Sequence, residues 1–322
     1  MVTRPLVSVI IPVYNGESVV VAAIESMLNQ TVEDIKIIVV DDASKDNTVS
    51  MIRETFNDHR IRIIEHLTNR GAAAARNTGI LSSQKSEFIA FLDADDISLA
   101  HRVEAQLNYL DQNKTVGGVG SAVTLFGEEN GSIEPLCSPE DVAASTMFTC
   151  EFLMPTMTFR NSAFKKLNGD WFRPEYGPNC DWELVARMVM NGILIGNLPE
   201  HLVRYRRWPQ QMTARIVDTV DCPATRLRSE MLDWFGIQEH HHQDMSSHIM
   251  VSPCYWPIER RPNKQFTIEK GERWLKLLRD FNEHIAANCW ADRKLEPDSI
   301  RKTLNRCEEQ LHLSCAEQRE IA

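Results

Sequence analysis

The chain has 322 residues, of which 43% are hydrophobic and 25% charged, as in an ordinary globular enzyme. These fractions exclude a disordered chain, a collagen-like repeat and a small disulfide-stapled scaffold. The formal net charge of -10 argues against a dedicated nucleic-acid-binding protein, which needs a basic surface to release counterions from phosphates. We therefore expect a folded protein whose partners do not include nucleic acid.

The cysteine spacing and the lengths of the apolar runs bear on the cellular location of the protein. The eight cysteines include no C-x-x-C pair, which predicts reduced thiols and neither a zinc site nor a disulfide framework. The first apolar run is too short for a signal-peptide core, and no run approaches the roughly 18 residues of a membrane-spanning helix. The sequence therefore predicts a cytoplasmic protein that does not span a membrane.

In chain order, short β-branched runs alternate with helix-compatible segments up to Phe126. The expected strands are residues 7–11, 35–40, 61–66, 88–92 and 116–121. The expected helices are residues 18–29, 47–56, 71–83 and 99–112. This alternation predicts an α/β fold with a doubly wound, mostly parallel sheet that carries helices on both faces.

Beyond Phe126 the alternation stops, and a loop-rich connection is expected over residues 127–150. The expected elements after it are an extended segment at 152–159, helices at 161–167 and 181–191, and short strands at 193–197 and 202–206. The later candidate helices are 224–235, 269–287 and 299–311. We place a boundary near Ala214, between a sheet-containing domain (1–214) and a mainly helical C-terminal region (215–322).

Polar residues follow four of the expected strands, at residues 12–17, 41–46, 69–71 and 93–96. In a doubly wound sheet, ligands bind outside the carboxyl ends of the strands, so these residues are candidates for a site. Asp93 and Asp95 are two positions apart in extended chain, and both carboxylates can therefore reach one hard divalent cation. The sequence predicts a metal-dependent enzyme that acts on a phosphate-bearing substrate.

Taken in this order, the strand-end motifs resemble those of the family 2 glycosyltransferases of the A-type fold, which transfer sugars from nucleotide diphosphates with inversion. The motifs are Ser8-Val9-Ile10-Ile11-Pro12-Val13-Tyr14-Asn15, Val39-Val40-Asp41-Asp42-Ala43-Ser44-Lys45-Asp46, Asn69-Arg70-Gly71 with Ala75-Arg76-Asn77-x-Gly79, and Phe91-Leu92-Asp93-Ala94-Asp95-Asp96. The resemblance covers residues 7–213. It implies a Rossmann-like sheet domain that binds the nucleotide sugar and carries catalysis.

The resemblance also implies which residues bind the donor. Asp42 would accept a hydrogen bond from the imide of a uracil base, and Pro12 and Tyr14 would flank that base. Arg76 would reach the nucleotide or its phosphates, and Asp93 the ribose and metal-bound water. The other expected donor-site residues are Glu17, Asp41, Asn69 and Ala94. The structural alternative for Asp42 is a cap of the helix that follows it.

For the metal and the catalytic base, the resemblance points to three acidic residues. Asp95, together with Asp93, would bind Mn²⁺ or Mg²⁺ beside the donor diphosphate. Asp181 would deprotonate the acceptor hydroxyl, its structural alternative being a helix N-cap. Cys180 departs from the family, which has an acidic residue there, and Trp208 replaces a histidine that often completes the metal shell. Since indole cannot ligate a metal, Asp95 is expected to be the main protein ligand.

We therefore predict an inverting, metal-dependent hexosyl- or N-acetylhexosaminyltransferase that uses a UDP-sugar donor. The resemblance implies a glycan or lipid-linked oligosaccharide acceptor, in lipopolysaccharide or capsule biosynthesis. A lipid-linked acceptor would bring the protein to the inner face of the cell membrane as a peripheral protein. The helical spacing of apolar residues over 264–287 predicts packing on the catalytic domain, on a second subunit of an oligomer or on a membrane surface.

Three other functions share parts of this pattern. A sugar-phosphate nucleotidyltransferase has a similar sheet and a metal aspartate, but it usually has a glycine-rich basic first loop, which residues 13–17 lack. A receiver module has its acidic pair after the first strand, whereas Asp41-Asp42 follows the second. A non-catalytic nucleotide-sugar-binding protein remains open as an alternative because of Cys180 and Trp208.

Three adjacent histidines occupy residues 240–242. We interpret them as an exposed loop, because the side chains of neighbouring positions do not converge on one metal ion.

Overall fold

The computed structural model describes residues 6–208, 223–234, 268–285 and 297–321. The three-histidine cluster and the domain boundary expected near residue 214 lie outside these ranges. Within them, no helix has both the length and the hydropathy needed to cross a bilayer.

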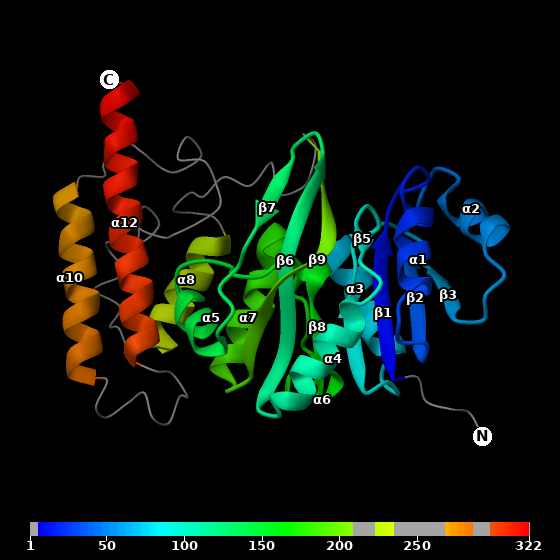
Figure 1. Ribbon diagram of the computed structural model, residues 1–322, viewed down its shortest axis with the longest axis horizontal. Helices are drawn as coiled ribbons and strands as arrows, with labels where there is room; N and C mark the ends of the chain where they lie inside the picture. Colours follow the sequence, from blue (N-terminus) through cyan, green and yellow to red (C-terminus); the bar gives the residue numbers. More distant parts are fainter. Residues whose placement is uncertain (1–5, 209–222, 235–267, 286–296, 322) are drawn as a thin grey trace.

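The sheet has a parallel half and a mixed half. The parallel half contains β1 (Val7–Val13), β2 (Ile35–Asp41), β3 (Ile61–Glu65) and β4 (Phe88–Phe91). The mixed half contains β5 (Ile97–Ser98), β6 (Val116–Gly127), β8 (Thr158–Arg160) and β9 (Leu194–Arg207), and β7 (Gly131–Ile133) pairs with β6 outside the main path. Across the described strands the order is β3-β2-β1-β4-β8-β6-β9-β5. This arrangement confirms the mostly parallel α/β sheet (Figure 1).

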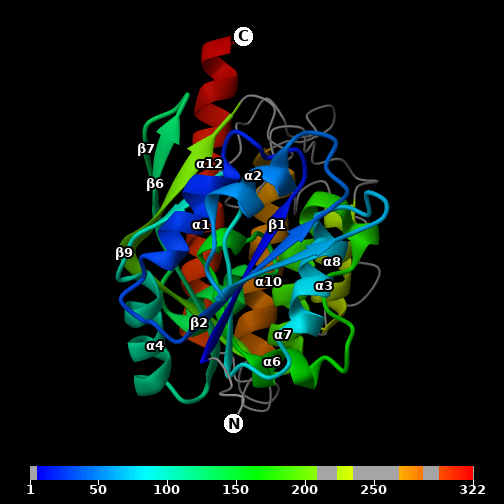
Figure 2. The same cartoon turned by 90° about the vertical axis from the view of Figure 1, so that its right-hand side faces the viewer.

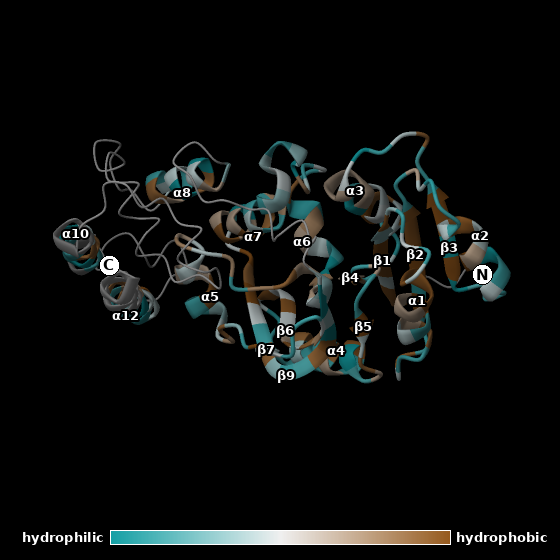
Figure 3. Ribbon diagram, turned by 90° about the horizontal axis from the view of Figure 1, so that it is seen from above, coloured by the Kyte–Doolittle hydropathy of each residue, from teal (hydrophilic) through white to brown (hydrophobic). Residues whose placement is uncertain are grey.

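Helices cover both faces of this sheet, as the sequence predicts. The helices up to β9 are α1 (Val20–Leu28), α2 (Thr48–Thr55), α3 (Ala72–Ser82), α4 (Arg102–Gln112), α5 (Pro139–Ser145), α6 (Asn161–Lys166) and α7 (Cys180–Met190), with 3-10 turns η1 (Met154–Thr156) and η2 (Pro174–Asn179). Helices α3 and α7 lie on one face, and α1 and α4 on the other (Figures 2 and 3). Because β1 is covered on both faces, its residues are nearly all buried and apolar.

The C-terminal region consists of α8 (Pro223–Trp234), α10 (Ile268–Ile285) and α12 (Pro297–Ile321) in the ranges described. Helices α10 and α12 pack side by side at the end of the molecule farthest from β3, and α12 contacts α5 (Figure 1). Leu227, Trp274 and Leu304 belong to the same hydrophobic core as Phe159 of β8. The C-terminal helices therefore share their core with the sheet domain.

Some expected elements differ from the structure because of tertiary pairing. Residues 193–197 and 202–206 form one strand, β9, since β6 pairs with it in parallel along its length, with register shifts that absorb the irregularity. The expected extended segment 152–159 contains the turn η1 before β8 begins. The expected loop 127–150 includes α5, whose N-cap Ser138 accepts a hydrogen bond from the backbone N–H of Asp141.

Helix α3 lies unusually close to β1, which sets the position of its side chains. A Cβ on Gly79 would lie 2.4 Å from Cγ2 of Ile10, so only glycine permits this approach. At the other end, Gly71 is the N-cap residue with φ of 85°, a conformation that favours glycine. The close contact holds Arg76, between these two glycines, over the carboxyl ends of the strands.

A buried ionic network fixes α7 and the segment before it. Glu183 accepts from Arg187 Nε at 2.6 Å and from Arg173 Nη1 at 3.1 Å, and its side chain is only 2% exposed. Arg187 also donates to the carbonyl oxygens of Asp170 and Trp171. This network therefore holds the backbone leading to Phe172, whose ring lies under the Arg76 guanidinium at 5.5 Å.

Replacing Glu183 by glutamine should destabilise the protein, because the buried Arg187 and the partly buried Arg173 would lose a charged partner. We expect Glu183→Gln to lower the free energy of unfolding by about 3 kcal/mol, as when one partner is removed from a buried ion pair. Urea unfolding measures the change. Glu175→Gln, at an exposed position of η2, is the matched control and should stay within about 0.5 kcal/mol of the wild type. Equal stability of Glu183→Gln and the control would contradict the structural role of the network.

Candidate functional site

A cavity of about 1220 Å³ opens at the carboxyl ends of β1 and β4, between them and the start of α7. Nine of the residues predicted from the sequence line it: Pro12, Tyr14, Asp42, Asn69, Arg76, Asp93, Ala94, Asp95 and Asp181. Glu17 and Asp41 do not. The cavity also has an apolar wall that the sequence did not indicate, which includes Phe152, Leu153, Met154, Pro174 and Pro178.

Glu17 and Asp41 support loops at the edge of the cavity. The Glu17 carboxylate accepts a hydrogen bond from the backbone N–H of Asn47 at 2.9 Å, which ties the loop after β1 to the loop after β2. Asp41 accepts from the backbone N–H of Ser44 at 3.0 Å, while its buried Oδ1 has no hydrogen-bond partner among the described atoms. Both side chains thus shape the loops around Tyr14, whose ring is half exposed at the cavity mouth.

Asp42 anchors the loop that leads into α3. Its carboxylate accepts from the backbone N–H groups of Arg70 at 2.9 and 3.0 Å and of Gly71 at 2.7 Å, and it lies 2.7 Å from Nδ1 of His66. Nε2 of His66 is in turn 2.9 Å from the hydroxyl of Thr78. Asp42 therefore does not cap the helix that follows it, α2, but the start of α3. Sequence reasoning missed His66, and the only signal for it is its position at the end of the third expected strand.

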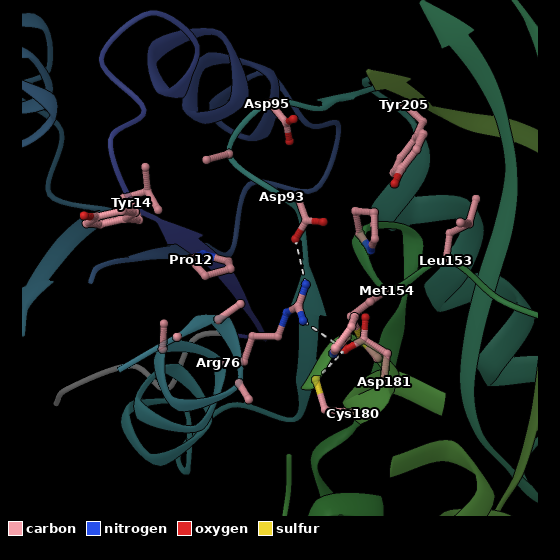
Figure 4. A pocket seen from close by; sticks show the side chains of 18 of the residues that line it. Pro12, Tyr14, Arg76, Asp93, Asp95, Leu153, Met154, Cys180, Asp181 and Tyr205 are labelled. Atoms are coloured by element: carbon pink, nitrogen blue, oxygen red, sulfur yellow. Dashed lines mark hydrogen bonds and ion pairs between the residues drawn. The ribbon is translucent and has the colours of Figure 1, made fainter. Parts of the chain in front are cut away.

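Arg76 connects the two sides of the cavity. Its Nη2 donates to Asp93 Oδ1 at 3.0 Å and its Nη1 to Asp181 Oδ1 at 2.9 Å (Figure 4). Burial acts to lower the pKa of the guanidinium, but Asp181 and Asp93 outweigh it and raise the pKa above its ordinary value. Arg76 is therefore a permanent cation placed between carboxylates that are far apart in the sequence.

Asp181 lies in the first turn of α7, with its side chain 26% exposed at the cavity. The N-cap position belongs to Asn179, so the structural alternative for Asp181 is not the one observed. Burial raises the pKa of the Asp181 carboxyl group, and the Arg76 charge opposes that rise. An aspartate with a raised pKa binds a proton more readily than an ordinary surface aspartate, which suits a group that takes a proton from a hydroxyl.

Asp95 faces the cavity beside a stack of three side chains. Trp208 Nε1 donates to Asp95 Oδ2 at 2.9 Å, and Arg206 Nε donates to the Asp95 carbonyl oxygen at 3.1 Å. The Arg206 guanidinium lies between the rings of Phe126 and Trp208, at 4.3 and 5.3 Å from their centroids. Burial and the charge of Asp93 raise the pKa of Asp95. Trp208 therefore orients the carboxylate through a hydrogen bond.

The carboxylates of Asp93 and Asp95 could supply part of the coordination shell of a metal ion, with a bound ligand supplying the rest. Within the described residues, no group of three or more His, Cys, Asp and Glu side chains is arranged to hold a metal ion. Asp93 Oδ1 is engaged by Arg76 and Asp95 Oδ2 by Trp208, which leaves each carboxylate its second oxygen. Since Mg²⁺ is commonly bound by one or two carboxylates, water and substrate phosphates, this donor set fits a metal held jointly with a diphosphate.

Comparison with known proteins shows which family the chain belongs to. Residues 8–172 match the model of Glycosyl transferase family 2. The chain is 27% identical over 278 residues to an uncharacterized glycosyltransferase of Haemophilus influenzae, covering 78% of this chain and 85% of that protein. It is 44% identical over 108 residues to WfgD of Escherichia coli, described as UDP-Glc:alpha-D-GlcNAc-diphosphoundecaprenol beta-1,3-glucosyltransferase. That match covers 34% of this chain and 42% of WfgD.

Solved structures show the same fold. Residues 1–349 of Staphylococcus aureus TarS in complex with UDP-GlcNAc superpose with a TM-score of 0.61 at 16% identity, covering 94% of this chain and 91% of that one. The mannosyltransferase PcManGT of Pyrobaculum calidifontis, in complex with GDP-Man and Mn²⁺, gives a TM-score of 0.50 at 18% identity, covering 98% and 87%. The family match, the glycosyltransferase relatives and this common fold lead to one conclusion: the chain belongs to glycosyl transferase family 2.

Proposed function

We propose that this glycosyltransferase inverts the anomeric centre as it moves a hexosyl or N-acetylhexosaminyl group from a UDP-sugar to a hydroxyl of a glycan acceptor. The observation that carries the proposal is the bridge from Asp93 through Arg76 to Asp181. Direct displacement with inversion needs groups that stabilise the leaving nucleoside diphosphate on one face of the sugar. On the opposite face it needs a base that takes the proton of the attacking hydroxyl. The bridge supports the proposal because it brings two carboxylates into a single cavity, one for each of these tasks.

The donor is proposed to bind with its base between Pro12 and Tyr14 and its diphosphate near Asp95. Each oxygen of Asp42 has two contacts, because His66 lies against Oδ1, the Gly71 N–H donates to Oδ2, and the Arg70 N–H is shared between both oxygens. The imide of a uracil would therefore replace one half of the shared Arg70 hydrogen bond. A UDP-linked donor in the name of WfgD and UDP-GlcNAc in the TarS complex support this choice of nucleotide.

In the mechanism, Asp181 takes the proton of the acceptor hydroxyl as that oxygen attacks the anomeric carbon. Arg76 keeps Asp181 ionised before the reaction and holds Asp93 on the opposite side. Asp95, with Asp93, would hold Mn²⁺ or Mg²⁺, which neutralises charge on the leaving nucleoside diphosphate. The Mn²⁺ in the PcManGT complex supports a divalent metal. Arg206, stacked beside Asp95, adds positive charge on the same side.

The acceptor is proposed to be a glycan or a lipid-linked oligosaccharide of lipopolysaccharide or capsule synthesis, handled at the cytoplasmic face of the membrane. The WfgD name, with its diphosphoundecaprenol acceptor, supports this class. The apolar wall of the cavity includes Phe152, Leu153 and Met154, and Met154 lies next to Asp181 (Figure 4). Sugar faces can pack on apolar side chains of this kind.

Removing the charge of Asp181 should abolish transfer and spare donor binding. We expect Asp181→Asn to lower kcat by about a hundred- to ten-thousand-fold, the usual worth of a general base, with UDP-sugar affinity within about threefold of the wild type. Transfer and hydrolysis rates with a panel of UDP-sugars, together with calorimetric binding, measure both quantities. The control is Asp298→Asn, at an exposed position of α12.

An Asp181→Asn enzyme with normal kcat would refute the base assignment. A wild-type protein that binds UDP-sugars but neither transfers nor hydrolyses any of them would favour a non-catalytic nucleotide-sugar-binding protein instead.

Asp95 should couple metal to nucleotide. In the wild type we expect Mn²⁺ to strengthen UDP binding at least tenfold, because a cation held by Asp95 would neutralise charge on the diphosphate. Asp95→Asn should lose most of that gain while keeping the metal-free affinity. Calorimetric titration of UDP with and without Mn²⁺ gives both values, with the exposed Asp111→Asn on α4 as control. An undiminished Mn²⁺ effect in Asp95→Asn would show that the metal binds elsewhere.

A further inference from the structure

Cys180 is a buried thiol in contact with the proposed base. Its Sγ lies 3.5 Å from Oδ1 of Asp181, within reach of an S–H hydrogen bond, and the residue is 4% exposed. Arg76 Nη1 donates to the same oxygen at 2.9 Å (Figure 4). Oδ1 therefore has two donors, whereas Oδ2 has no hydrogen bond to a residue that the structure describes.

The thiol can act only as a donor here. Burial raises the pKa of Cys180, the negative charge of Asp181 raises it further, and Arg76 only partly opposes them, so the group stays protonated at neutral pH. A protonated thiol offers one hydrogen, and the acceptor within reach is a carboxylate oxygen. The contact therefore stabilises the ionised form of Asp181 without adding charge to the site.

The charged and titratable groups around Asp181 come from several elements. Arg76 of α3 is the cation in contact with it, and Asp93 at the end of β4 adds a repulsive charge. Cys150 and Cys180 are protonated because burial raises the pKa of both thiols. Glu183, two residues further along α7, is neutralised by Arg173 and Arg187. Arg76 and the Cys180 thiol are thus the two groups that favour the ionised base.

We propose that Cys180 is a positioning residue that, with Arg76, holds Oδ1 of Asp181 so that Oδ2 alone meets the acceptor hydroxyl. The inference rests on the proposed role of Asp181 as the base. Rotation of the carboxylate would exchange its two oxygens, and two donors on one oxygen oppose that rotation more than a single donor does. The reactive oxygen is then already directed into the cavity before the acceptor binds, which lowers the reorganisation needed for proton transfer.

Kinetics of Cys180 variants test the positioning role. We expect Cys180→Ala to lower kcat about two- to tenfold, the worth of one neutral hydrogen bond, with KM for the donor unchanged. The acid limb of the pH–rate profile should move to higher pH, because the lost donor favoured the ionised carboxylate. Cys180→Ser, which keeps a donor, should recover most of both effects. Wild-type kcat and pH profile in Cys180→Ala would overturn the proposal.

An infrared measurement tests the same contact independently of activity. The S–H stretch of Cys180, isolated as the difference between wild type and Cys180→Ala, should lie at the low frequency of a hydrogen-bonded thiol and rise in Asp181→Ala. Cys307→Ala, which removes a buried thiol on α12, should leave the Cys180 band in place. A Cys180 band that does not respond to Asp181→Ala would refute the hydrogen bond. A responsive band in a protein without transfer activity would instead count against the proposed function alone.

Discussion

A buried guanidinium between two carboxylates is the interaction on which this site depends. Arg76 is only 8% exposed in its side chain, and a charge so placed is costly unless it is paired. Asp93 and Asp181 provide that pairing from opposite sides of one cavity. The same contact fixes the spacing of the two carboxylates, favours the ionised form of the proposed base, and joins the parallel half of the sheet to α7. Removing the Arg76 charge would therefore affect folding and chemistry together.

Several contacts in the surrounding structure fix the position of Arg76. Gly79 lets α3 approach β1, and the Asp42 carboxylate fixes the loop at its start. Phe172 lies under the guanidinium, and the Glu183 network holds the backbone before Phe172. These supports come from segments well separated in the sequence. Side chains held by such contacts need less ordering when a ligand binds.

The sequence was informative where local pattern and fold coincide, and less so where function depends on pairing across the fold. Strands β1 to β4 follow from their apolar runs, and Asp93, Asp95 and Asp42 from their positions at strand ends. The bridge through Arg76 could not be predicted, because α7 reaches it only by way of antiparallel β8 and the turn η2. Trp208 showed only that a histidine was absent. Its hydrogen bond to Asp95 depends on β9 running alongside β6 as far as Arg207. His66 was marked only by its position at the end of the third expected strand, since its two partners, Asp42 and Thr78, lie on other segments.

The most direct test of the arrangement is a crystal structure of the protein with a UDP-sugar and Mn²⁺. The account predicts the diphosphate on the side of Asp93 and Asp95, the Asp181 carboxylate on the opposite face of the anomeric carbon, and Arg76 still bridging Asp93 and Asp181. A diphosphate bound next to Asp181, or Asp181 on the same face as the leaving group, would contradict it.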